Sequence, residues 1–313
     1  MKWLPEELED VFCDYCKSHE YSDTFKRTDG MRVVECAVCG LAYLNPRPLP
    51  TLIPKLYGKD YFTGVTADRG DGGLKINLEA PLPHVNKLPP RPITLVNDNH
   101  GGFTGKSVLE IGCATGDLLL WAKNEGANIK GVEISDVAAE VARKRGLDVS
   151  TGTIEDFVRT NNEKYDIVFA FEVIEHVTSP TSFLKRISSV LKFDGLLILS
   201  TPNYRCAFSL REKWYGFCTS YEHLYFLSID VLKRLGNNNK LHLEYWESNM
   251  KKTSENPIGQ SWIDKKIIWV CKLLCLVRDF GFIRIISDKK LRKTQYQPFG
   301  DNHVLIVAYK KST

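Results

Sequence analysis

The sequence predicts an α/β protein with a mostly parallel sheet, preceded by a small module that a metal ion holds together. From about residue 106 to residue 235, short apolar runs alternate with helical segments, which is typical of a parallel sheet covered by helices on both faces. Two C-x-x-C pairs lie near the start of the chain. Of 313 residues, 43% are hydrophobic and 26% are charged, which excludes a disordered, collagen-like or membrane-bundle protein and leaves room for about two domains.

The first element is the cysteine module, expected at residues 1–48. Its cysteines leave two residues inside each pair and 19 residues between the pairs. Two such turns facing each other complete a tetrahedral zinc site, and four thiolates leave no position for water, so the zinc is expected to be structural. The stretch between the pairs predicts two strands around a turn at Asp29-Gly30. The expected ligands are Cys13, Cys16, Cys36 and Cys39.

The alternative for this module is four reduced cysteines in a small sheet. A segment of about 40 residues, however, has too small a hydrophobic core to fold without a disulfide bond or a bound metal ion. Nine cysteines in all, and acidic residues where a signal peptide would be basic and apolar, predict a reducing compartment and cytoplasmic localisation. Acidic residues outnumber basic ones up to residue 39, so nucleic acid is not an expected partner.

Residues 49–105 are expected to form a connector and part of a lid, because they carry many prolines and glycines, as in GDGG (70–73) and LPPRP (88–92). The alternating pattern begins after them. It predicts strands at 107–112, 129–135, about 148–150, 165–171, 195–201 and 240–248, and helices at 116–126, 136–146, from about 155, 180–192 and 228–236.

The turn after the first strand, EIGCATGD (110–117), is glycine-rich but is not G-x-G-x-x-G. A dinucleotide pyrophosphate needs close backbone approach at the missing glycine, whereas an acid at Glu110 suits a ligand with an ammonium group. Glu133 stands 23 residues later at the end of the next strand, where an acid accepts hydrogen bonds from both ribose hydroxyls of a nucleoside. Glu155 and Asp156 follow the third strand and either face a purine ring or cap a helix.

Five segments in order, VLEIGCATGDLL, GVEIS, GTIEDF, YDIVFAFEVIEHV and LKFDGLLILSTPN, resemble class I S-adenosylmethionine-dependent methyltransferases. The similarity is to ubiquinone-type O-methyltransferases and to sugar and natural-product methyltransferases, and it covers about half the chain. The front end CxxC…CxxCGLAYLNPRP resembles the zinc-binding domain that precedes many of them. The resemblance implies a Rossmann-like seven-stranded sheet, a methyltransferase domain at 106–313 and a helical insertion at 249–302 before the last strand, HVLIVAYKK at 303–311.

The resemblance also implies a binding site for S-adenosylmethionine. The glycine turn would cradle the methionine part, with Glu110 near its ammonium, Glu133 on the ribose and Asp156 near the adenine amine. The full implied set is Glu110, Gly112, Cys113, Gly116, Asp117, Glu133, Ile134, Glu155, Asp156, Phe171 and Glu172.

Methyl transfer from a sulfonium is an in-line displacement, so the protein must align the acceptor and remove a proton from it. Glu175 and His176 follow the fourth strand in FEVIEHV, and relatives with this E-x-x-E-H arrangement suggest a divalent ion there. His223 lies in a loop expected to overhang the acceptor pocket, and a histidine is a neutral base near pH 7. His223, His176 and Glu175 are therefore the catalytic candidates; the alternatives are a structural His176 and a His223 that only bonds the lid.

The predicted activity is methyl transfer to oxygen, or less favourably to carbon or nitrogen, of a small molecule: a sugar, a nucleotide-linked sugar or another secondary metabolite. The alternatives are a nicotinamide-dependent oxidoreductase, which the absent G-x-G-x-x-G disfavours, and a non-catalytic zinc-ribbon adaptor. The net charge of the chain is +4. Residues 265–293 contribute +7, so the other residues together carry −3. This basic segment predicts docking of an anionic acceptor, peripheral contact with a membrane surface, or a solvated helix face.

Overall fold

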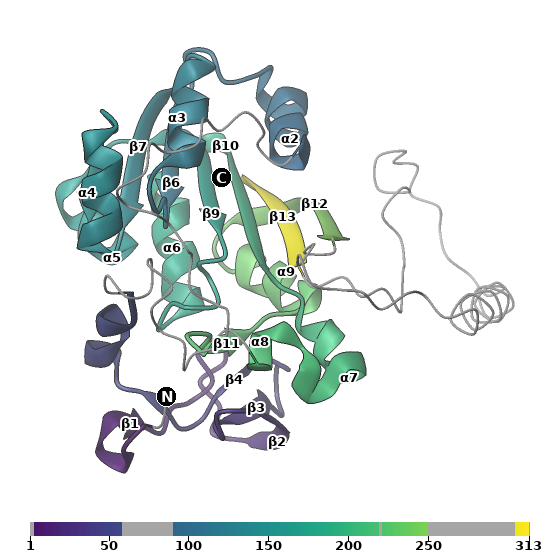
Figure 1. The fold of residues 1–313 in the computed structure, drawn as a ribbon. Helices are drawn as coiled ribbons and strands as arrows, with labels where there is room; N and C mark the ends of the chain where they lie inside the picture. The colour runs from purple at the N-terminus through teal and green to yellow at the C-terminus, as the bar shows by residue number, and fades with distance from the viewer. Residues whose placement is uncertain (1–2, 58–89, 219–220, 250–303, 313) are drawn as a thin grey trace, which may run out of the picture.

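The computed structural model describes residues 3–57, 90–218, 221–249 and 304–312, and its main feature is a seven-stranded sheet (Figure 1). The strand order is β12-β13-β10-β9-β6-β7-β8, which confirms the predicted Rossmann-like sheet. All pairs from β10 to β8 are parallel, and β13 is antiparallel to both its neighbours. The strands are β6 (Ser107–Ile111), β7 (Asn128–Glu133), β8 (Val149–Thr151), β9 (Tyr165–Phe171), β10 (Leu191–Pro202), β12 (Leu241–Asn249) and β13 (Val304–Lys311).

The central strands are buried on both faces, as continuous apolar runs predict. In β9, Val168 and Ala170 pack in one hydrophobic cluster, whereas Ile167 and Phe169 pack in the cluster on the opposite face. Helices α5 (Ile154–Thr160), α6 (Pro180–Val190) and α9 (Ile229–Asn237) contribute to the first cluster. Helices α2 (Pro90–His100) and α3 (Asp117–Asn124) contribute to the second, and α4 (Asp136–Lys144) packs beside α3.

Helix α2 lies in the stretch that the sequence led us to expect as connector. Its first turn contains Pro90 and Pro92, which read as loop punctuation but are tolerated where a helix begins because no intrahelical donor is lost there. Leu95 and Val96 of this helix are buried against the sheet. Residues 90–100 therefore belong to the packed core of the α/β body.

The N-terminal part forms a second, smaller sheet of order β11-β4-β3-β2. Strands β2 (Tyr21–Lys26) and β3 (Arg32–Cys36) flank a turn in which Gly30 has φ +92°, which confirms the predicted hairpin. Strand β4 (Ala42–Leu44) pairs with β11 (Tyr225–Phe226), which comes from the α/β body. Strands β1 (Leu8–Glu9) and β5 (Arg47–Pro48) form a separate pair.

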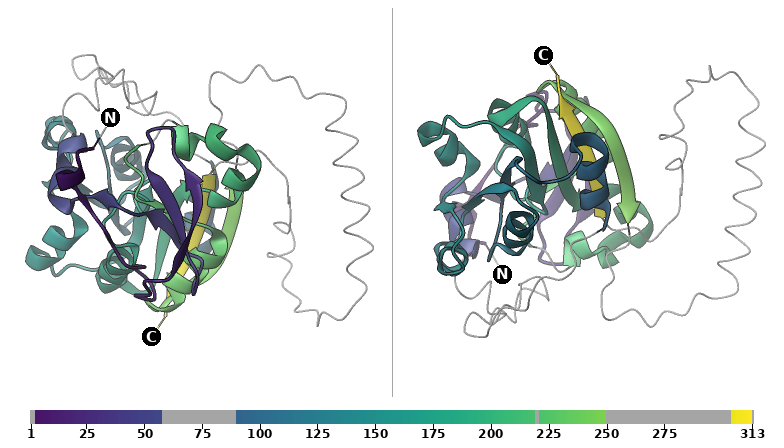
Figure 2. Two further views of the ribbon diagram at one scale, coloured as in Figure 1. Left: turned by 90° about the horizontal axis from the view of Figure 1, so that it is seen from below. Right: turned by 90° about the horizontal axis from the view of Figure 1, so that it is seen from above.

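The remaining helices of the described residues are short, and those labelled η are 3₁₀ helices: η1 (Pro5–Glu7), η2 (Pro50–Tyr57), η4 (Tyr204–Cys206), α7 (Ala207–Leu210), η5 (Arg211–Lys213) and α8 (Tyr215–Cys218). The N-terminal strands lie against the segment that follows β10, as the purple and green ribbons of Figure 2 show. Val33 and Leu44 of the small sheet share a hydrophobic core with Phe183 of α6 and Phe226 of β11. The cysteine module is thus packed onto the α/β body.

The predicted insertion at 249–302, with its basic segment 265–293, lies outside the described residues apart from Asn249. Across the described ranges, no helix is both long enough and apolar enough to cross a membrane.

Candidate functional site

Two glutamates mark the carboxyl ends of neighbouring strands β6 and β7. Glu110 is 7% exposed, and its Oε2 atom has no hydrogen-bond partner among the described residues. Burial, reinforced by the nearby Glu133, raises the pKa of Glu110 to about 8 from 4.5. A buried carboxylate oxygen without a donor is costly, so this position fits a ligand that brings its own donor and positive charge.

The turn between β6 and α3 is shaped by backbone geometry. Gly112 has φ +72°, and a Cβ on it would lie 2.5 Å from Val173 Cγ2. Gly116 has φ +82°, and a Cβ there would lie 2.3 Å from Leu147 Cδ1. Ala114 also has a positive φ, of 46°, which a non-glycine residue adopts only at a cost. The turn therefore needs both glycines, one for each close approach.

Glu133 ties this turn to the end of β7. Its Oε2 accepts the Ala114 backbone N–H at 2.8 Å and its Oε1 accepts that of Ser135 at 2.9 Å. Burial raises its pKa above the ordinary value. Each oxygen keeps a further acceptor position, so the geometry fits a nucleoside with two adjacent hydroxyls. Together with the orphaned oxygen of Glu110, these residues fit S-adenosylmethionine.

Other residues expected at the cofactor make local contacts. The Cys113 side chain packs in a hydrophobic cluster with Leu119, so only the backbone of Cys113 is available to a ligand at the turn. Asp117 accepts a hydrogen bond from Arg145 Nη1 at 2.6 Å. Ile134 is half-buried just after β7, and the Phe171 ring lies 5.4 Å from that of Phe169.

Asp156 and Glu155 lie in the first turn of α5. Thr153 donates its hydroxyl to Asp156 Oδ2 at 2.7 Å and accepts the Asp156 N–H at 3.2 Å, a capping box that lowers the pKa of Asp156. Glu155 accepts a hydrogen bond from Ser182 at 3.4 Å. The contacts of Asp156 are therefore those of a helix cap, which is the alternative to a contact with the purine ring.

The acceptor-side candidates converge beyond β9. Glu172 follows this strand with φ +53°, and Ser200 on β10 donates to its Oε1 at 2.8 Å. Glu175 and His223 are almost fully buried, with 1% and 4% of their side chains exposed. His176 Nε2 and His223 Nε2 lie 3.8 Å and 4.0 Å from Glu175 Oε1. The two imidazole rings meet edge to face with centroids 4.7 Å apart.

The structure therefore brings together all three catalytic candidates, although 46 residues lie between His176 and His223 in the sequence. One ligand atom from each lies within 4.8 Å of the others, a set that can hold a divalent cation. Tyr57 Oη contacts His176 Nδ1 at 2.8 Å. Sequence reasoning missed Tyr57, because a single tyrosine in a presumed connector carries no pattern.

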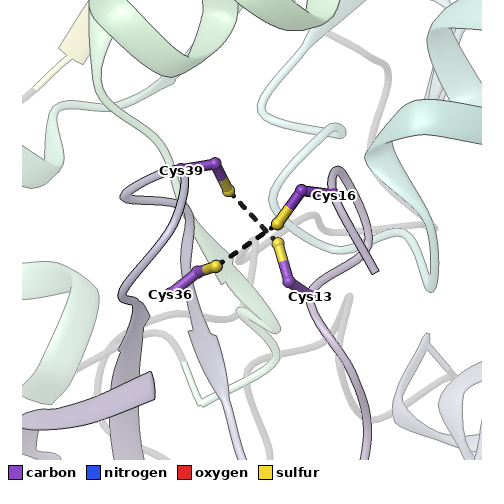
Figure 3. Close-up of side chains that lie close together, drawn as sticks. All are labelled: Cys13, Cys16, Cys36 and Cys39. Atoms are coloured by element: carbon purple, nitrogen blue, oxygen red, sulfur yellow. Dashed lines mark hydrogen bonds between the residues drawn. The ribbon is translucent and has the colours of Figure 1, made fainter. Parts of the chain in front are cut away.

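The four cysteines of the N-terminal module point toward a common centre (Figure 3). Cys13 Sγ lies 3.3 Å from Cys39 Sγ, and Cys16 Sγ lies 3.4 Å from Cys36 Sγ. Thiolates at about 2.3 Å from a tetrahedral zinc ion lie about 3.8 Å apart, so a small outward shift of the sulfurs accommodates the ion. All four sulfurs fall within 4.8 Å of one another, and the donor set fits Zn²⁺.

Comparison with known proteins adds independent findings. Residues 85–244, just over half of the chain, match the family model of a methyltransferase domain. The chain is 33% identical over 129 residues to the ubiquinone biosynthesis O-methyltransferase of Actinobacillus pleuropneumoniae serotype 7 (strain AP76) and 36% identical over 129 residues to that of Glaesserella parasuis serovar 5 (strain SH0165). Each alignment covers 38% of this chain and 55% of the relative. The chain thus spans about half the length of the curated relatives it matches.

Solved structures are similar at lower identity. A SAM-dependent methyltransferase from Archaeoglobus fulgidus has a TM-score of 0.47 and 16% identity, with 71% of this chain and 94% of that one covered. Magnesium protoporphyrin IX methyltransferase from Synechocystis PCC 6803 with bound SAH has a TM-score of 0.49 and 14% identity, with 81% and 98% covered. The family match and the strand order found here lead to one conclusion: the chain belongs to the class I S-adenosylmethionine-dependent methyltransferases.

Proposed function

We propose that the protein transfers a methyl group from S-adenosylmethionine to an oxygen atom of a small-molecule acceptor. The observation that carries the proposal is the convergence of Glu175, His176 and His223 next to the end of β9. An acceptor hydroxyl must lose its proton as the new bond forms, and a histidine held against a buried carboxylate is suited to take it. The names of the relatives as O-methyltransferases support oxygen as the methylated atom.

The cofactor supplies an activated methyl group on its sulfonium. In the proposed site, the Glu110 carboxylate pairs with the ammonium of the methionine part, and Glu133 accepts hydrogen bonds from the ribose. Gly112 and Gly116 keep the turn close to the ligand. Asp117, Ile134, Phe171 and Glu172, and Cys113 through its backbone, are proposed as further contacts. Glu155 is proposed in preference to Asp156 for the adenine end because Asp156 caps its own helix.

The acceptor proposed first is a sugar, a nucleotide-linked sugar or another secondary metabolite. Its hydroxyl would face His223 as the base, with Glu175 holding the imidazolium that forms. A divalent cation on Glu175, His176 and His223 is the second form of this chemistry, because a bound cation lowers the pKa of a coordinated hydroxyl. His223 and Glu175 act in both forms, whereas His176 acts only in the second, so variants at His176 and titration with Mg²⁺ or Mn²⁺ distinguish them.

The domain assignment is also part of the proposal. Residues 1–48 form a structural zinc ribbon, residues 49–89 link it to the catalytic body, and that body runs from helix α2 (Pro90–His100) to residue 313. Asp14, between the first two cysteines, accepts hydrogen bonds from Ser179 Oγ at 2.7 Å and the Thr181 N–H at 2.8 Å at the start of α6. These contacts support a ribbon that helps to build the site.

The experiment that tests the proposal is acceptor profiling with methyl-labelled S-adenosylmethionine. The panel contains 3,4-dihydroxybenzoate, UDP-glucose and dTDP-glucose, and mass spectrometry locates the methyl group. We expect transfer to oxygen of at least one class. Binding of the cofactor without transfer to any member would favour the adaptor alternative, and transfer to carbon or nitrogen would overturn the assignment of oxygen.

A further inference from the structure

A buried arginine of the cysteine module contacts the loop that carries His223. Arg27 follows β2, and its side chain is 0% exposed. Its Nε donates to Asp29 Oδ1 at 3.1 Å, and its Nη2 donates to Asp29 Oδ2. A buried guanidinium is tolerated only when its N–H groups donate hydrogen bonds. The Asp29 carboxylate, itself 2% exposed, accepts those on the Nε and Nη2 side of the guanidinium.

The other side of the guanidinium reaches across to the α/β body. Nη1 of Arg27 donates to the carbonyl oxygens of Tyr221 at 3.1 Å and His223 at 3.0 Å. The guanidinium carbon lies 5.5 Å from the centre of the Tyr221 ring. One planar group therefore fixes two carbonyls on either side of Glu222, nearly 200 residues further along the chain.

The same loop is held from its other end by the site itself. The Leu224 N–H donates to the backbone carbonyl of Glu175 at 2.8 Å, and the Leu224 carbonyl accepts the Leu44 N–H at 2.9 Å. His223 thus stands between the Arg27 contacts and a backbone bond to Glu175. Its Nε2 faces Glu175 Oε1 because the backbone on both sides is fixed.

We propose that Arg27 is a positioning residue of the acceptor site: it fixes the backbone of residues 221–223 so that His223 faces Glu175. This inference rests on the proposed function of His223. A lysine cannot take over, because its three donors share one atom and cannot span a carboxylate and two carbonyls. Displacement of a catalytic group by about 1 Å costs up to about 100-fold in rate, so Arg27→Lys should lower kcat by about that factor.

The first test observes His223 without an acceptor. Long-range ¹⁵N NMR of the full chain with bound S-adenosylhomocysteine reports the pKa and tautomer of its histidines, and His223→Gln assigns the signals of His223. Arg27→Lys should change the pKa or tautomer of His223. Arg32→Lys is the matched control, because Arg32 pairs with the exposed Asp23 on the same hairpin. An identical His223 titration in Arg27→Lys and Arg32→Lys would overturn the inference.

A double variant separates positioning from stability. Arg27→Met with Asp29→Leu removes both buried charges, which avoids leaving one of them unpaired. Its thermal unfolding should lie closer to that of the wild type than that of Arg27→Met alone, while its kcat stays low and its affinity for S-adenosylhomocysteine is retained. If kcat recovers together with the thermal stability, Arg27 serves stability alone and the inference fails.

A kinetic cycle separates this inference from the proposed function. With the acceptor that reacts fastest in the panel, Arg27→Lys should cost no further activity in a His223→Gln background, because both changes remove the same contribution. If His223→Gln lowers kcat but Arg27→Lys does not, Arg27 is not a positioning residue and the proposed base stands. If His223→Gln leaves kcat unchanged, the proposed base is wrong, and the NMR comparison alone decides whether Arg27 orients the loop.

Discussion

At the residue scale, Glu110 combines deep burial with an oxygen that lacks a donor among the described residues. Its pKa of about 8 lies above 4.5, so at pH 7 the carboxyl of the unliganded protein carries a proton. A raised folded-state pKa means that its contribution to stability is present below pH 4.5 and is lost as the pH rises to about 8. A cationic ligand reverses this preference, because an ammonium group favours the carboxylate.

We therefore expect S-adenosylhomocysteine binding at pH 7 to release about one proton per site. Calorimetry in buffers with different ionisation enthalpies measures this number. Glu110→Gln removes the titrating group, so the variant should release none and bind more weakly. Equal proton release by the wild type and Glu110→Gln would contradict the assignment of Glu110 to the ammonium.

Gly116 of the turn between β6 and α3 offers a second test at this scale, with Gly146, which follows α4, as the comparison. Gly116→Ala should cost more free energy of unfolding than Gly146→Ala, although both residues have φ near +80°. A Cβ at Gly146 meets nothing within 4 Å, so Gly146→Ala loses only the free energy of placing alanine in a left-handed conformation, about 1 kcal/mol. At Gly116 the clash of the Cβ with Leu147 adds about 1 to 3 kcal/mol to that loss. Urea unfolding of the two variants measures the difference, and equal losses would mean that the turn relaxes freely.

At the scale of elements, Asp14 of the cysteine module accepts two hydrogen bonds from the start of α6. Asp14→Ala removes the acceptor for Ser179 and Thr181 at the start of this helix, so we expect a loss of about 1 to 2 kcal/mol in the free energy of unfolding. Asp23→Ala, at an exposed ion pair of the same module, should cost less than about 0.5 kcal/mol. Thermal unfolding of both zinc-loaded variants compares them. An equal effect of the two changes would show that Asp14 does not join the module to the body.

Elements with a repeating pattern could be predicted, and those fixed by distant contacts could not. The run YDIVFAF gave β9 with its observed ends, because a strand buried on both faces needs a continuous apolar run. Helix α2 escaped prediction because Pro90 and Pro92 mimic a loop. The strand β11, of two residues, exists because β4 lies beside it, and no local pattern encodes a partner 180 residues away.

The candidate site divides in the same way. Glu110 and Glu133 could be proposed from the sequence because the ends of neighbouring parallel strands meet at one edge of the sheet. Glu175 and His223 could be proposed because they lie in the segments that follow β9 and β10. Tyr57 and Arg27 contact the candidate site across the fold, at His176 and at the backbone of His223. Such contacts depend on how the module docks, which the spacing of its cysteines does not specify.

At the scale of the whole molecule, the cysteine module and the acceptor side of the site share one hydrophobic core. Zinc binding to such cysteine sites contributes about 10 kcal/mol or more to folding. Removal of zinc, or Cys36→Ser, should therefore abolish methyl transfer and lower the melting temperature. S-adenosylhomocysteine should still bind, because Glu110 and Glu133 lie on β6 and β7, outside the small sheet.

Mass spectrometry verifies the zinc content, and a methyl-transfer assay, thermal unfolding and calorimetry with S-adenosylhomocysteine follow the three predicted properties separately. Cys218→Ser is the control, because this cysteine lies outside the cluster of four. Zinc-free protein that unfolds at the same temperature as the loaded protein would contradict a structural zinc.

The measurement that tests the account most directly is single-turnover methyl transfer by the wild type, His223→Gln and the exposed control His242→Gln. Loss of a general base costs about 100- to 10,000-fold, so the account predicts a loss of that size in His223→Gln, unchanged binding of S-adenosylhomocysteine, and a wild-type rate in His242→Gln. A His223→Gln variant that transfers methyl groups at the wild-type rate would contradict the central claim that His223, held against Glu175, deprotonates the acceptor.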